Sequence, residues 1–122
     1  MTAIKKTSTI QENKQYAIDR CPVTYVMEKI GSYWKPIILF QLSLGEKRYG
    51  ELRRSIPTIT EKVLIQQLKQ LETDGLIVRE AKPVVPPFVN YKLSKSGEGL
   101  FPVLDAMAIW ATRELSGEAA IE

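Results

Sequence analysis

Lysine and glutamine side chains recur within one short segment of the chain. Lys62, Gln66, Lys69 and Gln70 stand among leucines that are spaced three or four residues apart. Lys can bond guanine acceptors or phosphates, and Gln can bond adenine in two places. The segment therefore has the composition of a surface that reads base edges, although Lys and Gln also form helices readily on any solvated face.

Cys21 is the only thiol in the chain, and it lies between Arg20 and Pro22. Pro22 suits the first turn of a helix, and both a helix N-terminus and a neighbouring cation favour the reactive thiolate. We therefore consider Cys21 a candidate redox switch that forms a disulfide with a second copy, a mixed disulfide with a small thiol, or a sulfenic acid. The alternative is a small apolar residue that packs beneath an interface and is inert.

The composition excludes most catalytic chemistry. The 122 residues include no histidine and one cysteine, which removes Ser-His-Asp and Cys-His catalysis and the usual Cys/His zinc sites. Neither a phosphate-cradling glycine loop nor an evident pair of carboxylates is visible. We therefore expect no enzyme activity, no metal and no cofactor.

A lone thiol cannot form an intrachain disulfide, which favours a reducing compartment. The sequence shows neither an export signal nor an apolar stretch of about 18 residues that could span a membrane. The fractions of hydrophobic residues, 44%, and of charged residues, 25%, are those of an ordinary soluble domain. We expect a cytoplasmic protein without a membrane partner.

Positive charge is concentrated in the middle of the chain. Residues 47–95 contain ten Lys or Arg against five Asp or Glu, whereas residues 96–122 contain only Arg113 against five acids. A basic middle indicates a surface that attracts polyanions. The alternative is a scatter of charges over solvated faces.

Apolar periodicity predicts four helices before residue 75. Their expected bounds are Pro22 to Ile30, Ser32 to Leu44, Gly50 to Ile56, and a helix that ends at Gly75 after a cap at Thr58 or Thr60. The spacing Thr58-x-x-Glu61 fits a capping box. The second helix is apolar on nearly all sides and should form the centre of the core. The third and fourth, joined by a tight turn, are a helix-turn-helix candidate.

The spacing of the apolar residues changes after residue 75 from the period of a helix to that of a strand. Residues 76–81 and 89–94 have the patterns of strands, and the proline-rich residues 82–88 between them predict a hairpin with a stiff tip. Ser94 can cap a long helix to about Leu115, in which Pro102 either bends the helix or follows an irregular first turn. The predicted fold is mainly α with a small β-hairpin (α+β), namely a winged helix-turn-helix with N- and C-terminal dimerisation helices.

A single domain is expected over residues 16–117, between a flexible arm at residues 1–15 and a flexible tail at residues 118–122. On a helical wheel, Lys62, Gln66 and Lys69 lie opposite the leucines of the fourth helix. Their place after a helix that carries Arg53 and Arg54, and before a hairpin, favours DNA reading over a solvated face. The expected DNA contacts are Thr60, Lys62, Gln66, Gln67, Lys69 and Gln70 in the groove, with Arg48, Arg53, Arg54 and Lys82 near phosphates.

The last helix carries an apolar stripe that is wider than one small domain needs. We expect it to pair with a second copy together with the first helix, the alternative being a helix folded back on its own domain. The predicted interface comprises Val23, Met27, Leu100, Phe101, Leu104, Met107, Trp110, Ala111 and Leu115.

Short motifs in a fixed order cover about residues 20–112. They are Cys21-Pro22-Val23, Gly31-x-x-Trp34, Arg48-Tyr49, Glu51-Leu52-Arg53, Ile56-Pro57-x-Ile59, Leu64-x-Gln66-x-Leu68-x-x-Leu71, Asp74-Gly75-Leu76-Ile77, Val85-Pro86-Pro87, Tyr91-x-Leu93 and Gly97. Together they resemble the HxlR-type transcriptional regulators, a family related to the MarR-like winged helix proteins. Three residues depart from the family pattern: Gly50 replaces a capping Asn or Ser, Gln67 replaces Arg, and Phe88 replaces Lys or Arg and could pack against a neighbour.

The resemblance implies a bacterial or archaeal homodimeric DNA-binding regulator whose dimer is built mainly from the first and last helices. It also implies thiol sensing, because several members sense electrophiles or oxidants through a cysteine that matches Cys21. We therefore expect a sequence-specific regulator that reads an inverted-repeat, double-stranded operator, with no small-molecule effector specified. The alternative is a winged helix module for protein–protein contact without DNA binding.

Overall fold

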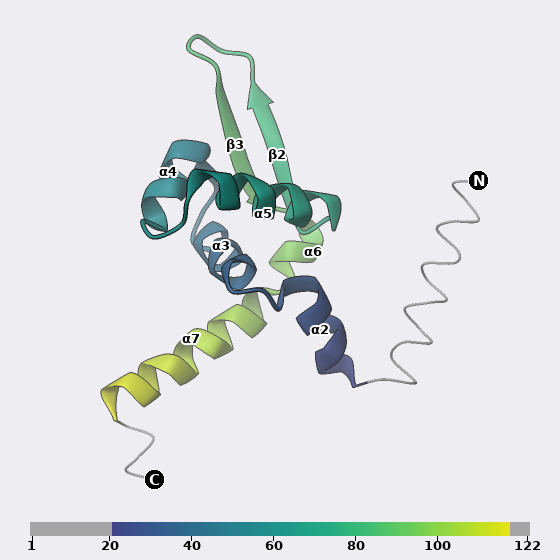
Figure 1. Ribbon diagram of the computed structural model, residues 1–122, viewed down its shortest axis with the longest axis vertical. Coiled ribbons are helices and arrows are strands. Elements are labelled where there is room, and N and C mark those ends of the chain that lie inside the picture. The colour runs from purple at the N-terminus through teal and green to yellow at the C-terminus, as the bar shows by residue number, and fades with distance from the viewer. Residues whose placement is uncertain (1–20, 118–122) are drawn as a thin grey trace, which may run out of the picture. The chain divides into compact units, whose positions relative to one another are not determined.

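The computed structural model describes residues 21–117 (Figure 1). The chain divides into two compact units, residues 1–32 and residues 33–122. The expected arm at residues 1–15 and the expected tail at residues 118–122 lie outside the described residues. Within the described part, no helix has the length and apolar character needed to cross a membrane.

The first unit contributes one described helix, α2 (Pro22–Ile30). Pro22 occupies the first turn, where its missing N–H costs nothing, and Gly31 follows the last residue. The N-cap is Cys21, in an extended conformation and with an exposed side chain. The first predicted helix is thus confirmed with its boundaries.

The core of the second unit is built around α3 (Trp34–Ser43), which contacts α4 (Tyr49–Ser55), α5 (Glu61–Thr73) and the later α7. Ile38 and Leu39 of α3 are fully buried, as are Leu52 of α4 and Leu64 of α5. This confirms the central helix expected from its apolar composition. The helix begins at Trp34 rather than at Ser32, with Tyr33 at the N-cap position.

The helix-turn-helix consists of α4 and α5. The Glu51 carboxylate accepts a hydrogen bond from the Arg48 backbone N–H at 2.8 Å and so fixes the start of α4. At the start of α5, the Thr60 hydroxyl accepts from the Val63 N–H at 3.3 Å. The capping box expected at Thr58 is wrong, because the turn buries Ile59 and the next residue, Thr60, becomes the N-cap.

The sheet has three antiparallel strands in the order β1-β3-β2, not only the expected hairpin. Strand β2 (Ile77–Lys82) pairs with β3 (Phe88–Leu93), and β1 (Lys47–Arg48) adds to the other edge of β3, with Arg48 opposite Asn90. A two-residue strand is too short to show alternation in the sequence, which explains why β1 was not predicted.

The segment after the sheet forms two helices, α6 (Lys95–Glu98) and α7 (Phe101–Ser116), so the single helix expected from Ser94 is wrong. Pro102 lies in the first turn of α7, which confirms that it follows an irregular turn. The Ser94 hydroxyl accepts from the Gly97 N–H at 3.0 Å and donates to the Gly75 carbonyl at 2.5 Å. This Ser94 clamp joins the two ends of the β2–β3 segment.

Gly97 lies against the Leu76 backbone, and a Cβ added there would overlap the Leu76 carbonyl oxygen. We expect Gly97→Ala to lower the free energy of unfolding by about 1–3 kcal/mol in urea titrations. Gly50→Ala is the control, since its Cβ would meet only the end of the flexible Arg54 side chain. That control should be unchanged or slightly more stable, and equal stability of the two variants would contradict the close packing.

Candidate nucleic-acid interface

One side of α5 is core and the opposite side is open. Leu64, Leu68 and Leu71 are buried. The exposed side carries Lys62, Gln66, Lys69 and Gln70, while Gln67 is half-buried. Within residues 21–117, Lys62 and Lys69 take part in no ion pair. The helix thus brings together a cluster of polar and cationic groups, as the helical wheel predicted.

The carboxylates of α5 border this cluster on the cavity side, where Lys69 lines the same cavity. Glu61 and Glu72 line a cavity that α5 shares with α4 and the sheet. Glu61 also pairs with Arg53 of α4 at 3.8 Å, and both side chains are exposed. Such an exposed pair contributes at most about 1 kcal/mol. The exposed Lys/Gln face of α5, formed by Lys62, Gln66, Lys69 and Gln70, is therefore bordered by carboxylates at its Lys69 edge.

Arg48 stacks on Phe88 at the edge of the sheet. The guanidinium carbon lies 3.7 Å from the centre of the Phe88 ring, within the range of a cation–π interaction. The expected packing of Phe88 against a neighbour is thereby confirmed. Because the ring occupies the face of the guanidinium, the N–H donors in the guanidinium plane stay available at its edge.

Two lysines of the hairpin share one carboxylate. Glu80 lies 3.6 Å from the Lys82 ammonium and 3.5 Å from the Lys92 ammonium. Partial burial raises the pKa of the Glu80 carboxyl, but the charges of Lys82 and Lys92 and a hydrogen bond from Asn90 outweigh this effect. The pKa of Glu80 therefore lies below its ordinary value, and the charge of Lys82 is partly compensated.

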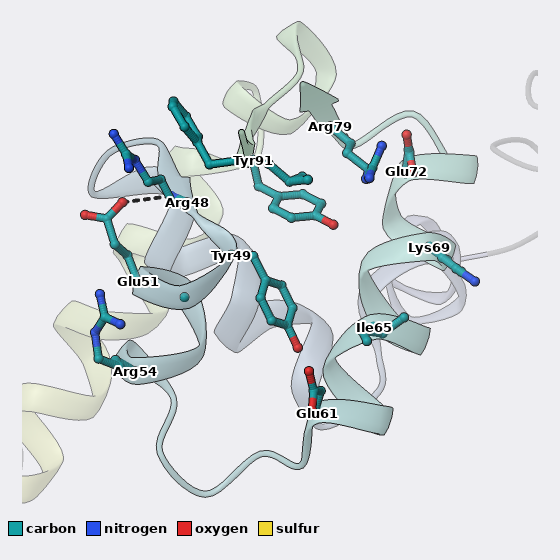
Figure 2. Close-up of a pocket in the computed structure, with 13 residues that line it drawn as sticks. Arg48, Tyr49, Glu51, Arg54, Glu61, Ile65, Lys69, Glu72, Arg79 and Tyr91 are labelled. Atoms are coloured by element: carbon teal, nitrogen blue, oxygen red, sulfur yellow. Dashed lines mark hydrogen bonds between the residues drawn. The ribbon is translucent and has the colours of Figure 1, made fainter. Parts of the chain in front are cut away.

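A cavity of about 840 Å³ is lined by residues of α4, α5 and the sheet (Figure 2). Its lining consists of Arg48, Tyr49, Gly50, Glu51, Arg54, Glu61, Ile65, Lys69, Glu72, Arg79, Phe88, Val89 and Tyr91. The buried Tyr49 hydroxyl has no hydrogen-bond partner among residues 21–117, and it points toward Glu61 (Figure 2). Burial raises the pKa of Tyr49, and the negative charge of Glu61 raises it further.

Arg79 is a basic residue of this cavity that sequence reasoning missed. It lies on β2 opposite Tyr91 and lines the cavity together with Lys69 of α5. The available signal was its spacing of two residues from the buried Ile77, which places both side chains on the same face of the strand. The sequence-based set instead contained Lys82, at the far end of the same strand.

The residues expected at a dimer interface differ in exposure. On α7, Phe101, Met107, Trp110 and Leu115 are exposed, with Trp110 at 66%. Leu100 and Ala111 are half-buried, whereas Leu104 is buried and lines an apolar groove with Pro36, Ile37 and Phe40 of α3. On α2, Val23 and Met27 are exposed.

A helix-turn-helix backed by leucines and followed by a β-hairpin defines the winged helix class. Residues 29–119 match the family profile described as HxlR-like helix-turn-helix. The chain belongs to this HxlR-like family, as the sequence motifs predicted.

Several relatives are similar over most of the chain. YtcD, an uncharacterized HTH-type transcriptional regulator of Bacillus subtilis, is 43% identical over 105 residues, which are 86% of this chain and 81% of YtcD. A MarR-family regulator from Porphyromonas gingivalis superposes with a TM-score of 0.73 at 41% identity, covering 77% of this chain and 92% of its own.

The oxidized form of the redox regulator HypR superposes with a TM-score of 0.71 at 40% identity, covering 75% of this chain and 95% of HypR. These comparisons place the chain among transcriptional regulators with a helix-turn-helix domain, which are not enzymes.

The Arg48–Phe88 stack is expected to contribute to stability. In a double-mutant cycle of Arg48→Ala and Phe88→Leu, urea unfolding should give a coupling energy of about 0.5–1 kcal/mol. The cycle of Lys95→Ala and Phe88→Leu is the control, because Lys95 lies on α6 and not against the ring. Additive effects in both cycles would show that the stack stabilises nothing.

Proposed function

We propose that the protein is a sequence-specific DNA-binding transcriptional regulator that acts as a homodimer on an inverted-repeat operator. The observation that carries the proposal is the exposed Lys/Gln face of α5, opposite its buried leucines. In this class of fold the second helix of the motif enters the major groove. A helix held by its core side presents that face at a constant angle, as base reading requires.

The groove residues in this proposal are Lys62, Gln66, Lys69 and Gln70, joined by Thr60 and Gln67. Gln66 and Gln70 suit adenine, and the two lysines suit guanine or phosphate. The Thr60 oxygen already accepts the bond that caps α5, so its hydroxyl proton is the part left for DNA.

The phosphate contacts are assigned to Arg48, Arg53, Arg54 and Lys82. Arg53 and Lys82 each have a carboxylate neighbour in the free protein, Glu61 and Glu80 respectively. Exchanging such an exposed pair for a phosphate costs little, because the pair itself contributes at most about 1 kcal/mol. Arg48 is already held by Phe88, so less conformational entropy is lost when it binds.

The exposed side of α7 supports the homodimer. Met107, Trp110 and Leu115 are all exposed on one helix, and Trp110 is the kind of large aromatic residue that anchors interfaces. A second copy that presents the same surface would bury it by two-fold pairing. Two copies of α5 would then read two half-sites about one duplex turn apart or at multiples of it, hence the inverted repeat.

A second candidate function is a winged helix that contacts only other proteins. The exposed apolar side of α7 is the observation that favours it, since such a side fits any apolar partner. Retention on heparin and binding of bulk DNA at low salt separate the two candidates, because only a DNA-binding protein gains affinity by releasing counterions.

The DNA-binding proposal is tested with duplexes that the wild-type protein selects from a random-sequence pool. Gln66→Ala should lose about 1–3 kcal/mol of discrimination at one base pair of each half-site. Arg53→Ala should weaken selected and unselected duplexes alike and lower the salt slope of the affinity by about 1. Fluorescence anisotropy at several salt concentrations measures both effects.

Lys95→Ala is the matched control, since it removes an exposed cation outside the assigned surface. Its affinity and salt slope should equal those of the wild type. Unchanged affinity in both the Gln66 and the Arg53 variants would mean that the recognition surface lies elsewhere.

The dimer is tested with Trp110→Asp, which places a charge within the apolar surface of α7. Sedimentation equilibrium at micromolar protein should show a dimeric mass for the wild type and a monomeric mass for the variant. Ile109→Asp is the control, because Ile109 is exposed and lies two residues, or about 200°, from both Met107 and Ala111 of the predicted interface. A monomeric mass of the wild type at this concentration would contradict the proposed homodimer.

Cys21 is proposed as a thiol switch of this regulator. Its side chain is exposed, stands at the N-cap of α2 and makes no capping hydrogen bond. The similarity to HypR, a redox regulator solved in oxidized and reduced forms, supports the same role here. Diamide would take up the two electrons and two protons released when two Cys21 thiols form a disulfide.

The switch predicts that diamide changes the operator affinity of the wild type and not that of Cys21→Ser. Anisotropy before and after diamide, and after subsequent reduction, measures the effect. Serine has nearly the same size as cysteine and would occupy the same exposed position. The Cys21→Ser variant therefore removes the thiol with little effect on the structure. Equal responses of the two proteins would contradict the proposed thiol switch but not the proposed DNA binding.

A further inference from the structure

Ile65 is the exposed apolar residue of α5. The other apolar side chains of this helix are buried or half-buried, whereas Ile65 is 40% exposed. It also lines the open cavity of about 840 Å³, so empty space lies beside it on the side of the sheet. Apolar surface left in water costs free energy, which a ligand that covers Ile65 would recover.

Ile65 is a neighbour of both lysines of the Lys/Gln face. Residues three and four apart are adjacent on a helix surface, so Ile65 lies next to Lys62 and Lys69. Figure 2 shows Ile65 and Lys69 on the same stretch of α5. Ile65 is also the fifth of the 13 residues of α5, and the N-terminal residues of such a helix contact base edges. The exposed isoleucine therefore belongs to the part of α5 that would meet bases.

We infer that Ile65 contacts the C5-methyl group of a thymine in each half-site and thereby selects a T·A pair at that position. The inference rests on the proposed function, because it assumes that α5 occupies the major groove. The thymine methyl is the apolar group that base edges present in this groove, and cytosine lacks it. Ile65 thus adds a base preference to those of the polar side chains around it.

The neighbours of Ile65 on the Lys/Gln face recognise polar atoms. Lys62 and Lys69 can only donate hydrogen bonds, and the Gln66 amide donates and accepts them. These groups read the donor and acceptor pattern of a base edge, whereas a methyl group offers neither. An apolar side chain among them supplies the one kind of contact that their hydrogen-bonding groups lack.

The surroundings of Ile65 are compatible with this contact. Glu61 lies one turn before Ile65, and its charge is partly compensated by Arg53 at 3.8 Å. Isoleucine has one strongly preferred first side-chain torsion in a helix. Little conformational freedom is therefore lost when Ile65 packs against a base, which favours a specific contact.

The experiment replaces thymines by uracil, which pairs with adenine in the same way but has no methyl group. The duplex is one that the wild type selects from a random-sequence pool, and each thymine of one half-site is replaced in turn. Fluorescence anisotropy measures the affinity. At one position the replacement should weaken wild-type binding about three- to fivefold, as expected for the loss of one buried methyl group.

Ile65→Ala should bind the thymine duplex more weakly than the wild type by a similar factor, and uracil at the sensitive position should change its affinity no further. Its salt slope should stay that of the wild type, because no charge is altered. Ile65→Val should keep most of the uracil effect, since it retains a β-branched apolar side chain.

Val78→Ala is the matched control, because it shortens an exposed apolar side chain on β2 outside the assigned surface. It should show the full uracil effect. Urea unfolding checks that each variant is folded. The uracil scan of the wild type needs no variant, so it tests the methyl contact even if Ile65→Ala is unstable.

Equal affinity of the wild type for the thymine duplex and for every uracil duplex would overturn the methyl contact and leave the proposed DNA binding in place. An equal uracil effect in the wild type and in Ile65→Ala would also overturn it, because another side chain would then contact the methyl group. A wild type that selects no duplex at all would overturn both the proposed function and the role of Ile65.

Discussion

The packing of α5 against α3 is the constraint on which the rest of the second unit depends. Leu64, Leu68 and Leu71 are buried on one side of α5, and Ile38 and Leu39 are buried on α3, which contacts it. Each buried leucine contributes roughly 1.5–3 kcal/mol, and together they allow α5 one rotation about its axis. That rotation directs Gln66 outward and Glu61 toward the cavity, so the two side chains lie on different sides of the helix.

The cations around α5 illustrate a second constraint, which is that neighbouring like charges need compensating contacts in the folded protein. Arg53 and Lys82 lie beside carboxylates, and Arg48 lies on an aromatic ring. These contacts are weak enough to exchange in water, yet they limit repulsion among like charges. Local neutralisation of this kind explains how a strongly basic central segment folds compactly.

The sequence predicted the elements whose periodicity is long and regular, namely α2, α3, the helix-turn-helix and the hairpin. It did not predict β1, because a two-residue strand exists only through its pairing with Tyr91 and Asn90. The choice of Thr60 over Thr58 as the cap depended on the burial of Ile59, a tertiary effect. The exposed Lys/Gln face followed from helical geometry alone, whereas Arg79 became part of the site only when β2 was placed beside α5.

The Ser94 clamp has a consequence for how such a protein can diversify. Its hydroxyl joins the Gly75 carbonyl to the Gly97 N–H, and the Ser94 N–H itself donates to the Leu76 carbonyl at 3.0 Å. The chain is thus closed at the base of the hairpin, just after α5 ends and before α7 begins. Changes in the length or sequence of the hairpin beyond this closure need not disturb either helix. The hairpin is therefore an exchangeable module, and insertions or substitutions there can alter its contacts while the fold remains the same.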